Sequence, residues 1–201
     1  MFLIDRARSP PLGDRKGGHQ PTNPSSLVFF EDVAVRADEL VGTLDRGWPE
    51  LLEVLNTERI VTTACLVGAG HLALRLGIDY ANQRKVFGNR PIGAYQGLQF
   101  PMAQAHAELE CARLVNFKAA WLHDTGQPYG SEANVGKLIA SQAAMAAIER
   151  AMQAMGGMGF AKEAHLERLW RDARLFRFAP VSEEMILNFI AVHDLGLPRG
   201  Y

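Results

Sequence analysis

The spacing of apolar positions along the chain separates a long helical region from a shorter region that precedes it. From about residue 48 onward, apolar side chains recur three and four residues apart, which is the period of helices with one buried face. Proline and glycine divide this region into segments. We expect helices over about 48–86, 95–124, 131–155 and 163–173, and a last one from Ser182 to Gly196. Long helices joined by short loops predict an antiparallel bundle.

The first part of the chain has a different pattern. Residues 2–4 and 27–35 are rich in apolar, β-branched and aromatic side chains and predict strands, whereas 9–26 is rich in Pro, Gly, Ser and Asn and predicts a loop. These strands have little in the chain to pair with, so they resemble the tail of a β-domain. We therefore predict a mainly α fold, in which a short β remnant (1–46) precedes a four-helix-type bundle (47–201).

Composition and charge narrow the classes of function. The 201 residues are 48% hydrophobic and 21% charged with a formal net charge of −1, so neither a nucleic-acid-binding surface nor a charged tail is indicated. No uninterrupted run of about 18 apolar residues predicts a membrane span, and the N-terminus does not match a signal peptide. Cys65 and Cys111 fall in apolar helical patterns, which is typical of buried free thiols in a reducing compartment. We expect a cytoplasmic protein without nucleic-acid or membrane partners.

Two familiar ligand motifs are only weakly indicated. Gly68-x-Gly70-x-x-Ala73 matches part of a dinucleotide-binding fingerprint, but the helical period continues through it and no acidic residue follows about 20 positions later. Small residues that allow close helix packing explain this pattern better. The six histidines form no HExxH motif, and no Glu is followed three residues later by His, so we expect no metal site.

Glu58 is a candidate general base. Burial among apolar side chains favours the neutral form of a carboxyl group, and proteins use such surroundings to tune a base that works near neutral pH. The alternative is an ion pair, or a surface charge at the edge of the apolar stripe. On a helix, Glu58 shares a face with Leu51, Val54, Leu55, Val61 and Cys65.

Two helix ends offer further candidates. Arg84 stands where a long predicted helix ends, a place where the helix dipole favours a cation with or without a ligand. Gly156 and Gly157 end an Ala-rich helix, ordinarily as a C-cap, and they also expose backbone on which a flat or phosphorylated ligand fits.

Five segments together resemble one protein family. They are LVFFEDVAVRADELVG, LLEVLNTERI, YANQRKVFGNRPIGAYQGLQF, AMQAMGGMGF and ERLWRDARLF. In their order and spacing, the chain from about residue 27 resembles the C-terminal half of an acyl-CoA dehydrogenase. The resemblance implies the end of a middle β-domain followed by the C-terminal helical bundle of a flavoprotein. It also implies oxidation of an acyl-CoA thioester to the trans-2-enoyl-CoA with FAD, in which a carboxylate removes the α-proton while the β-hydrogen leaves as hydride.

The resemblance implies partners and site residues as well. Family members are usually tetramers in which a neighbouring bundle holds part of each FAD, and they pass electrons to an acceptor such as electron-transfer flavoprotein. We expect homo- or hetero-oligomers of this kind, with a lone chain holding half of an FAD site and half of an acyl-CoA site. Arg59 resembles the arginine that lines the acyl-CoA site. The residues that resemble the FAD contacts are Arg84, Phe87, Gln96, Gln153, Gly156 and Gly157.

The segment FAPVSEE departs from the family pattern. Most members carry the base as Glu in a Tyr-Glu-Gly-Thr turn, and that Glu aligns with Pro180 of this chain. Proline has no carboxylate to act as a base. It also lacks the backbone N–H that, in the family, helps bind the thioester carbonyl. A minority place the base on the earlier helix, where Glu58 stands. A shift of a few residues would instead bring Glu183 or Glu184 into the site. Three possibilities stay open: a dehydrogenase with Glu58 as base, a non-catalytic subunit that clasps FAD for a partner chain, and a truncated fragment.

Overall fold

The computed structural model describes residues 1–4, 15–16, 26–27, 30 and 32–200. The chain divides into two compact units, residues 1–55 and 56–201. Helix α1 (Gly47–Gln83) begins in the first unit and continues into the second.

The described residues of the first unit contain little regular structure before α1. Phe2 and Leu40 form an isolated antiparallel bridge beside the 3-10 helix η2 (Ala37–Glu39). Strands β1 (Arg15–Lys16) and β2 (Ser26–Leu27) pair in antiparallel fashion.

The predicted strands are largely absent from the described residues of this unit. The strand expected over 2–4 is reduced to the single bridge at Phe2. Of the strand expected over 27–35, Leu27 belongs to β2, but the described residues 30 and 32–35 are not in a strand. A β-branched run forms a strand only beside a partner, and no described segment pairs with 32–35. Most of the loop expected over 9–26 lies outside the described residues, although its residues 15–16 and 26 belong to β1 and β2.

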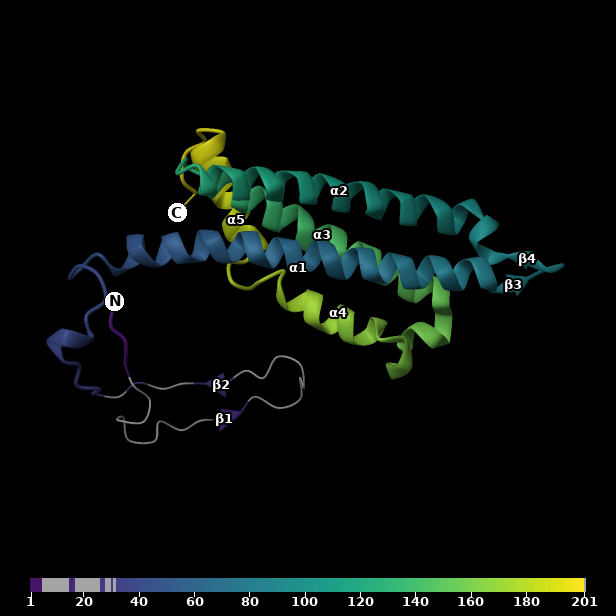
Figure 1. Ribbon diagram of the computed structural model, residues 1–201, viewed down its shortest axis with the longest axis horizontal. Coiled ribbons are helices and arrows are strands. Elements are labelled where there is room, and N and C mark those ends of the chain that lie inside the picture. The colour runs from purple at the N-terminus through teal and green to yellow at the C-terminus, as the bar shows by residue number, and fades with distance from the viewer. Residues whose placement is uncertain (5–14, 17–25, 28–29, 31, 201) are drawn as a thin grey trace. The chain divides into compact units, whose positions relative to one another are not determined.

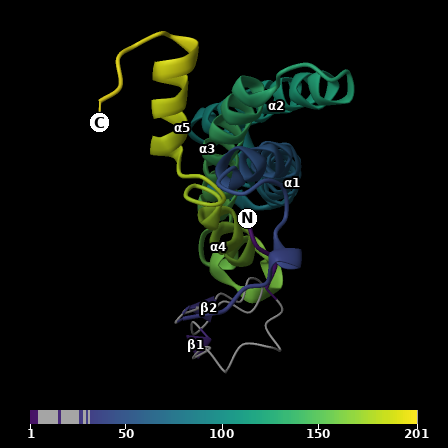
Figure 2. The ribbon, with the colours of Figure 1, turned by 90° about the vertical axis from the view of Figure 1, so that its left-hand side faces the viewer.

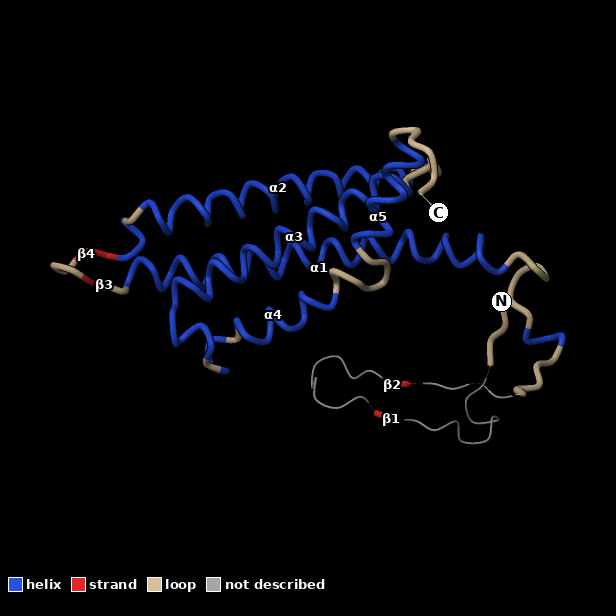
Figure 3. Tube along the Cα trace, turned by 180° about the vertical axis from the view of Figure 1, so that it is seen from behind, coloured by secondary structure: helices blue, strands red, loops and turns tan. Residues whose placement is uncertain are grey.

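The second unit is an antiparallel helical bundle, which confirms the predicted mainly α fold class (Figure 1). After α1, a hairpin of β3 (Lys85–Val86) and β4 (Arg90–Pro91) and the 3-10 helix η3 (Ile92–Ala94) lead into α2 (Gln96–Asp124). Helix α3 (Gly130–Met155) then runs back along α2, and Figure 3 shows these long helices side by side from behind.

Shorter elements complete the bundle. The chain continues through the 3-10 helices η4 (Gly156–Phe160) and η5 (Lys162–Ala164) into α4 (Leu166–Leu175). Helix α5 (Glu183–Phe189) and the π-helical segment η6 (Ile190–Asp194) follow. In the end-on view of Figure 2, α4 and α5 flank α3, which contacts both. The expected start of the last helix is confirmed, because the Ser182 hydroxyl accepts a hydrogen bond from the Met185 N–H at 3.3 Å.

Small residues let α1 approach its neighbours closely. A Cβ placed on Gly70 would lie 2.7 Å from Leu109 of α2, and one on Gly77 would lie 2.8 Å from Ala151 of α3, both too close for any real side chain. Gly68, by contrast, faces open space. Helix packing therefore accounts for Gly70 of the Gly68-x-Gly70 pattern, as the sequence favoured.

Helix α1 is also long and apolar enough to cross a membrane by length and composition alone. One 18-residue window has a mean hydropathy of 1.4, although no uninterrupted apolar run of that length exists, and 44% of the window is buried in the protein. The core helix of a soluble bundle meets the same criteria. Leu66, Ala73 and Leu74 are at most 3% exposed and belong to the core shared with α2 and α3, so we interpret α1 as a core helix.

The two cysteines are not buried, contrary to the expectation from the apolar pattern. Cys65 and Cys111 are exposed free thiols. Each directly precedes a core residue, Leu66 on α1 and Ala112 on α2. Successive helical residues are turned by about 100°, so each cysteine lies on a different side of its helix from the core residue that follows it.

Candidate functional site

The candidate site residues form two groups that lie far apart along α1. One group surrounds Glu58 and Arg59, and the other lies where α1 gives way to the hairpin. Arg84 follows Glu58 by 26 residues. At about 1.5 Å of rise per helical residue, this separation amounts to about 39 Å. The structure therefore does not bring all the predicted residues into one place, and the two groups form separate sites.

At the hairpin end, the backbone holds Arg84 firmly while its side chain stays exposed. The Arg84 N–H donates to the Tyr80 carbonyl at 2.8 Å, and the Arg84 carbonyl accepts from the Ile92 N–H at 2.9 Å. Phe87 is 91% exposed and has a φ of +43°, in the left-handed region that bulky residues rarely adopt. Such a residue is strained and packs little against the described residues, which favours contact with another molecule.

The C-terminal end of α3 presents open backbone at the same end of the bundle (Figures 1 and 3). Gly156 and Gly157 are exposed, and a Cβ on either would meet no described atom within 4 Å. Gln153 and Gly156 line a cavity of about 490 Å³ together with Arg150 and Trp170. Gln96, the exposed first residue of α2, also belongs to this end. All six residues that resemble FAD contacts thus lie at this end of the bundle.

At the other site, Glu58 is exposed rather than buried, so the expected apolar burial is wrong. Val61 and Cys65 share its face of α1, and Val61 is 60% exposed. The core face of this helix passes instead through Thr63, Leu66 and other residues. Because α1 is apolar on more than one side, its spacing alone does not identify the side that packs. Within the described part of the second unit, the face around Glu58 is an exposed surface on which Val61 and Cys65 lie beside the carboxylate.

Arg59 differs from its neighbour because its side chain is buried, with 4% exposed. One of its terminal nitrogens donates to the Asn56 side-chain oxygen, while its Nε has no hydrogen-bond partner among the described residues. Burial lowers the pKa of the Arg59 guanidinium, and the nearby Glu58 and Tyr129 partly offset that effect. Arg59 thus holds a buried positive charge next to the exposed Glu58, with one donor that no described residue uses.

Glu183 is held in a way that excludes it as a free base. It is 5% exposed, and Arg177 donates to both of its oxygens, from Nε at 2.8 Å and from a terminal nitrogen at 2.6 Å. The Ser141 hydroxyl donates at 2.8 Å. Burial alone would raise the pKa of Glu183, but the hydrogen bonds from Arg177, Ser141 and Gln142 together hold it below its ordinary value. This carboxylate fixes the start of α5 to α3.

Lys137 is a component of this region that the sequence did not reveal. Its side chain is fully buried in α3, and its Nζ donates to the carbonyl of Val181 at 2.7 Å, next to Pro180. Burial lowers the pKa of Lys137 to about 8, with Glu183 opposing the shift and Arg59 adding to it. The only signal in the sequence is a single lysine within an Ala-rich apolar run. Lys137 thus ties the turn before α5 to the core.

Comparison with known proteins identifies the family. A family model described as acyl-CoA dehydrogenase, C-terminal domain, matches residues 45–193. The chain belongs to the acyl-CoA dehydrogenase family. Over 176 residues it is 47% identical to acyl-CoA dehydrogenase FadE12 of Mycobacterium tuberculosis, a match that covers 87% of this chain and 45% of that relative. The family inferred from the sequence, a family of flavoprotein oxidoreductases in fatty-acid metabolism, is thereby confirmed.

Solved structures of related proteins share the fold. The structure of glutaryl-coenzyme A dehydrogenase in complex with glutaryl-CoA has a TM-score of 0.87 and 28% identity, covering 98% of this chain and 51% of that one. The FAD complex of PigA has a TM-score of 0.87 and 26% identity, with the same coverage of 98% and 51%. The chain spans about half the length of the relatives it matches.

Proposed function

We propose that this chain forms the bundle half of an FAD-dependent dehydrogenase that converts an acyl-CoA thioester to the trans-2-enoyl-CoA. The observation that carries the proposal is the gathering of Arg84, Phe87, Gln96 and the Gly156–Gly157 backbone at one exposed end of a family bundle. When bound, FAD supplies a hydride acceptor.

The hairpin end of the bundle fits a dinucleotide cofactor. Arg84 offers a cation to the phosphates, and the exposed ring of Phe87 offers an apolar contact. Gly156 and Gly157 leave room for the cofactor to approach the backbone, since no described atom lies within 4 Å of a Cβ at either position. Gln153, in the wall of the neighbouring cavity, adds an amide that both donates and accepts.

Glu58 is the proposed base. In the proposed reaction one of its carboxylate oxygens takes the proton from the substrate α-carbon, and the β-hydrogen leaves as hydride, so that a carbon–carbon double bond forms. The exposed apolar face beside Glu58 suits an acyl chain, and the positive charge of the adjacent Arg59 favours a polar or anionic group of the substrate near it. A positioned general base contributes roughly 10²- to 10⁴-fold in rate.

The separation of the two sites implies an oligomer. The hairpin end lies about 39 Å along α1 from Glu58. A flavin bound at the hairpin end of one chain is therefore too far from Glu58 of the same chain to react there, and it would serve Glu58 of another chain. Each catalytic site would then need two chains, either identical or from a heteromeric acyl-CoA dehydrogenase. An electron acceptor such as electron-transfer flavoprotein would reoxidise the flavin.

A second candidate function is a non-catalytic subunit that clasps FAD for a partner chain. Pro180 favours it, because proline lacks an N–H for the developing charge on the thioester carbonyl. Removal of one such donor typically costs on the order of 10²- to 10³-fold in rate.

A chimera separates the two candidates. This chain would replace the matching segment of FadE12, and flavin content and flavin bleaching by a series of acyl-CoA thioesters would be recorded. We expect bound flavin, loss of flavin in Arg84→Ala, and loss of bleaching with retained flavin in Glu58→Gln. Glu53→Gln, another exposed glutamate of α1, is the matched control.

The outcomes differ between the candidates. Flavin that binds but does not bleach with any thioester would favour the non-catalytic subunit. Equal bleaching in Glu58→Gln and the parent chimera would show that Glu58 is not the base. A folded, colourless chimera would refute the assignment of the hairpin end to FAD.

A further inference from the structure

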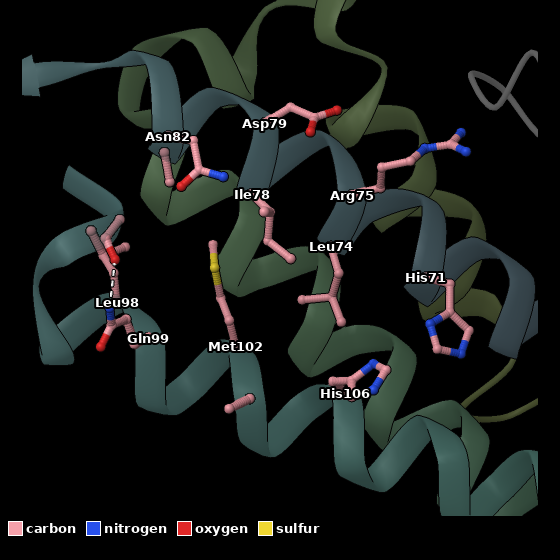
Figure 4. Close-up of a pocket in the computed structure, with 13 residues that line it drawn as sticks. His71, Leu74, Arg75, Ile78, Asp79, Asn82, Leu98, Gln99, Met102 and His106 are labelled. Atoms are coloured by element: carbon pink, nitrogen blue, oxygen red, sulfur yellow. Dashed lines mark hydrogen bonds between the residues drawn. The ribbon is translucent and has the colours of Figure 1, made fainter. Parts of the chain in front are cut away.

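Two histidines and a glutamate converge from α1 and α2, away from both sites described above. His71 lies on α1, and His106 and Glu110 lie one turn apart on α2. One ligand atom of each side chain lies within 4.8 Å of the other two. Figure 4 shows His71 and His106 in the space between the two helices, at one end of a cavity of about 600 Å³. Imidazole nitrogens and a carboxylate oxygen are a common ligand set for Zn²⁺.

Part of a tetrahedral site is already in place. The His71 Nε2 lies 3.2 Å from the Glu110 Oε1. Two ligands bound to zinc at about 2.0–2.2 Å in tetrahedral geometry lie about 3.3–3.5 Å apart, so this pair needs almost no movement. The rings of His71 and His106 have centroids 5.6 Å apart. Because His106 is exposed, its ring has room to rotate toward the other two ligands.

The glutamate is oriented by a further residue. Arg113, one turn further along α2, contacts the Oε2 of Glu110 at 2.5 Å, while Oε1 faces His71. Carboxylates that bind metals are commonly held by such outer contacts, which direct the remaining oxygen at the ion. No contiguous sequence motif contains these three ligands, because His71 precedes His106 by 35 residues and lies on a different helix. This is why the histidine spacing predicted no metal.

We propose that His71, His106 and Glu110 form a binding site for Zn²⁺, with the fourth position taken by water or an exchangeable ligand. With neutral imidazoles the three ligands carry one negative charge, part of which the Arg113 guanidinium offsets, so affinity for a divalent cation rests mainly on the coordinate bonds of the three ligands. A bound ion would link α1 to α2 and stabilise the folded chain, because the unfolded chain does not hold the three ligands together. The alternative is a surface ion pair of His71, Glu110 and Arg113 without a metal.

The test is a zinc titration of the full chain by calorimetry. Both cysteines are first changed in Cys65→Ser/Cys111→Ser, because these exposed thiols would bind zinc on their own. We expect one Zn²⁺ per chain and a zinc-dependent rise in melting temperature. His106→Ala, which removes an exposed side chain and so leaves the fold intact, should weaken binding by more than the roughly 10- to 100-fold that loss of an outer contact costs.

Matched variants make the test specific. Glu110→Gln should also weaken binding, whereas Glu108→Gln, on the same helix and hydrogen-bonded to Gln104, should not. His123→Ala removes another α2 histidine that lies beside a carboxylate, 3.3 Å from Asp124, and should leave zinc binding unchanged. Absence of saturable binding, or binding that survives both His106→Ala and Glu110→Gln, would refute the site and leave the ion pair as the explanation.

Discussion

The buried Lys137 predicts an unusual dependence of stability on pH. Its pKa is about 8 in the folded chain, against an ordinary value of 10.5, because burial disfavours its charged form. Below pH 8 both the folded and the unfolded states hold the proton, and the folded state carries the full cost of burying the charge. Between pH 8 and 10.5 the unfolded state still holds a proton that the folded state has released. Raising the pH through this window therefore stabilises the folded chain.

The magnitude follows from the difference between the two pKa values. About 2.5 pH units correspond to about 3 kcal/mol at roughly 1.4 kcal/mol per unit. Lys137→Met removes this cost but leaves the Val181 carbonyl without its donor, which costs about 1–3 kcal/mol. At pH 7 the two effects nearly cancel, so we expect the variant to match the wild type. At pH 10 the wild type should exceed the variant by about 2–3 kcal/mol.

Urea unfolding of both proteins at pH 7, 8, 9 and 10 measures this difference. Groups other than Lys137 titrate in both proteins, so their effects cancel in the comparison. Lys162→Met, which removes an exposed lysine, is the control for loss of charge without burial. A stability difference between wild type and Lys137→Met that stays constant from pH 7 to pH 10 would show that this lysine is not buried as a charged group.

Two further substitutions test the packing and the polar contacts of the bundle. Gly77→Val should lower the free energy of unfolding by about 1–3 kcal/mol, because α3 leaves no room for a side chain there. Gly68→Ala should raise the free energy of unfolding by up to about 1 kcal/mol, because this position faces open space and Ala favours a helix more than Gly does. Equal effects of the two substitutions in thermal melts would contradict this packing. Glu183→Gln should lower the free energy of unfolding in urea by about 2–3 kcal/mol, because it breaks the charged pair with Arg177. The loss stays moderate because Arg177 is partly exposed and water can solvate its charge. Glu184→Gln, on the exposed side of α5, is the control and should have little effect.

The helices of this fold were predictable from the sequence because their signals are local. Apolar period, proline and glycine placed the bounds of α1, α2 and α3 within three residues, and Ser182 marked the N-cap of α5. Of the strand expected over 27–35, Leu27 lies in β2, whereas the described residues 30 and 32–35 are not in a strand, because strand formation depends on a partner that local sequence does not specify. The apolar period also placed Glu58 on a packed face, although α1 carries a second apolar face that stays exposed.

The site residues were predictable only in part. Those at the hairpin end were recognised from family resemblance, and the structure adds that they gather at one exposed end. The contacts of Lys137 and Glu183 join segments more than 40 residues apart in the sequence, between α3 and the turn before α5. His71 and His106, 35 residues apart in the sequence, likewise meet across two helices. No single-sequence pattern encodes such pairings, because they arise only when the helices pack.

The continuity of α1 has a geometric consequence for how such a protein tolerates change in length. From Asn56 to Gln83 this helix has no break, so it fixes both the distance and the rotational phase between Glu58 and the hairpin. One residue inserted between them would shift the hairpin by about 1.5 Å and turn it by about 100° to another face of the bundle. Insertions are therefore expected in the connections 125–129 and 176–182, where they leave this phase unchanged, and not in the second half of α1.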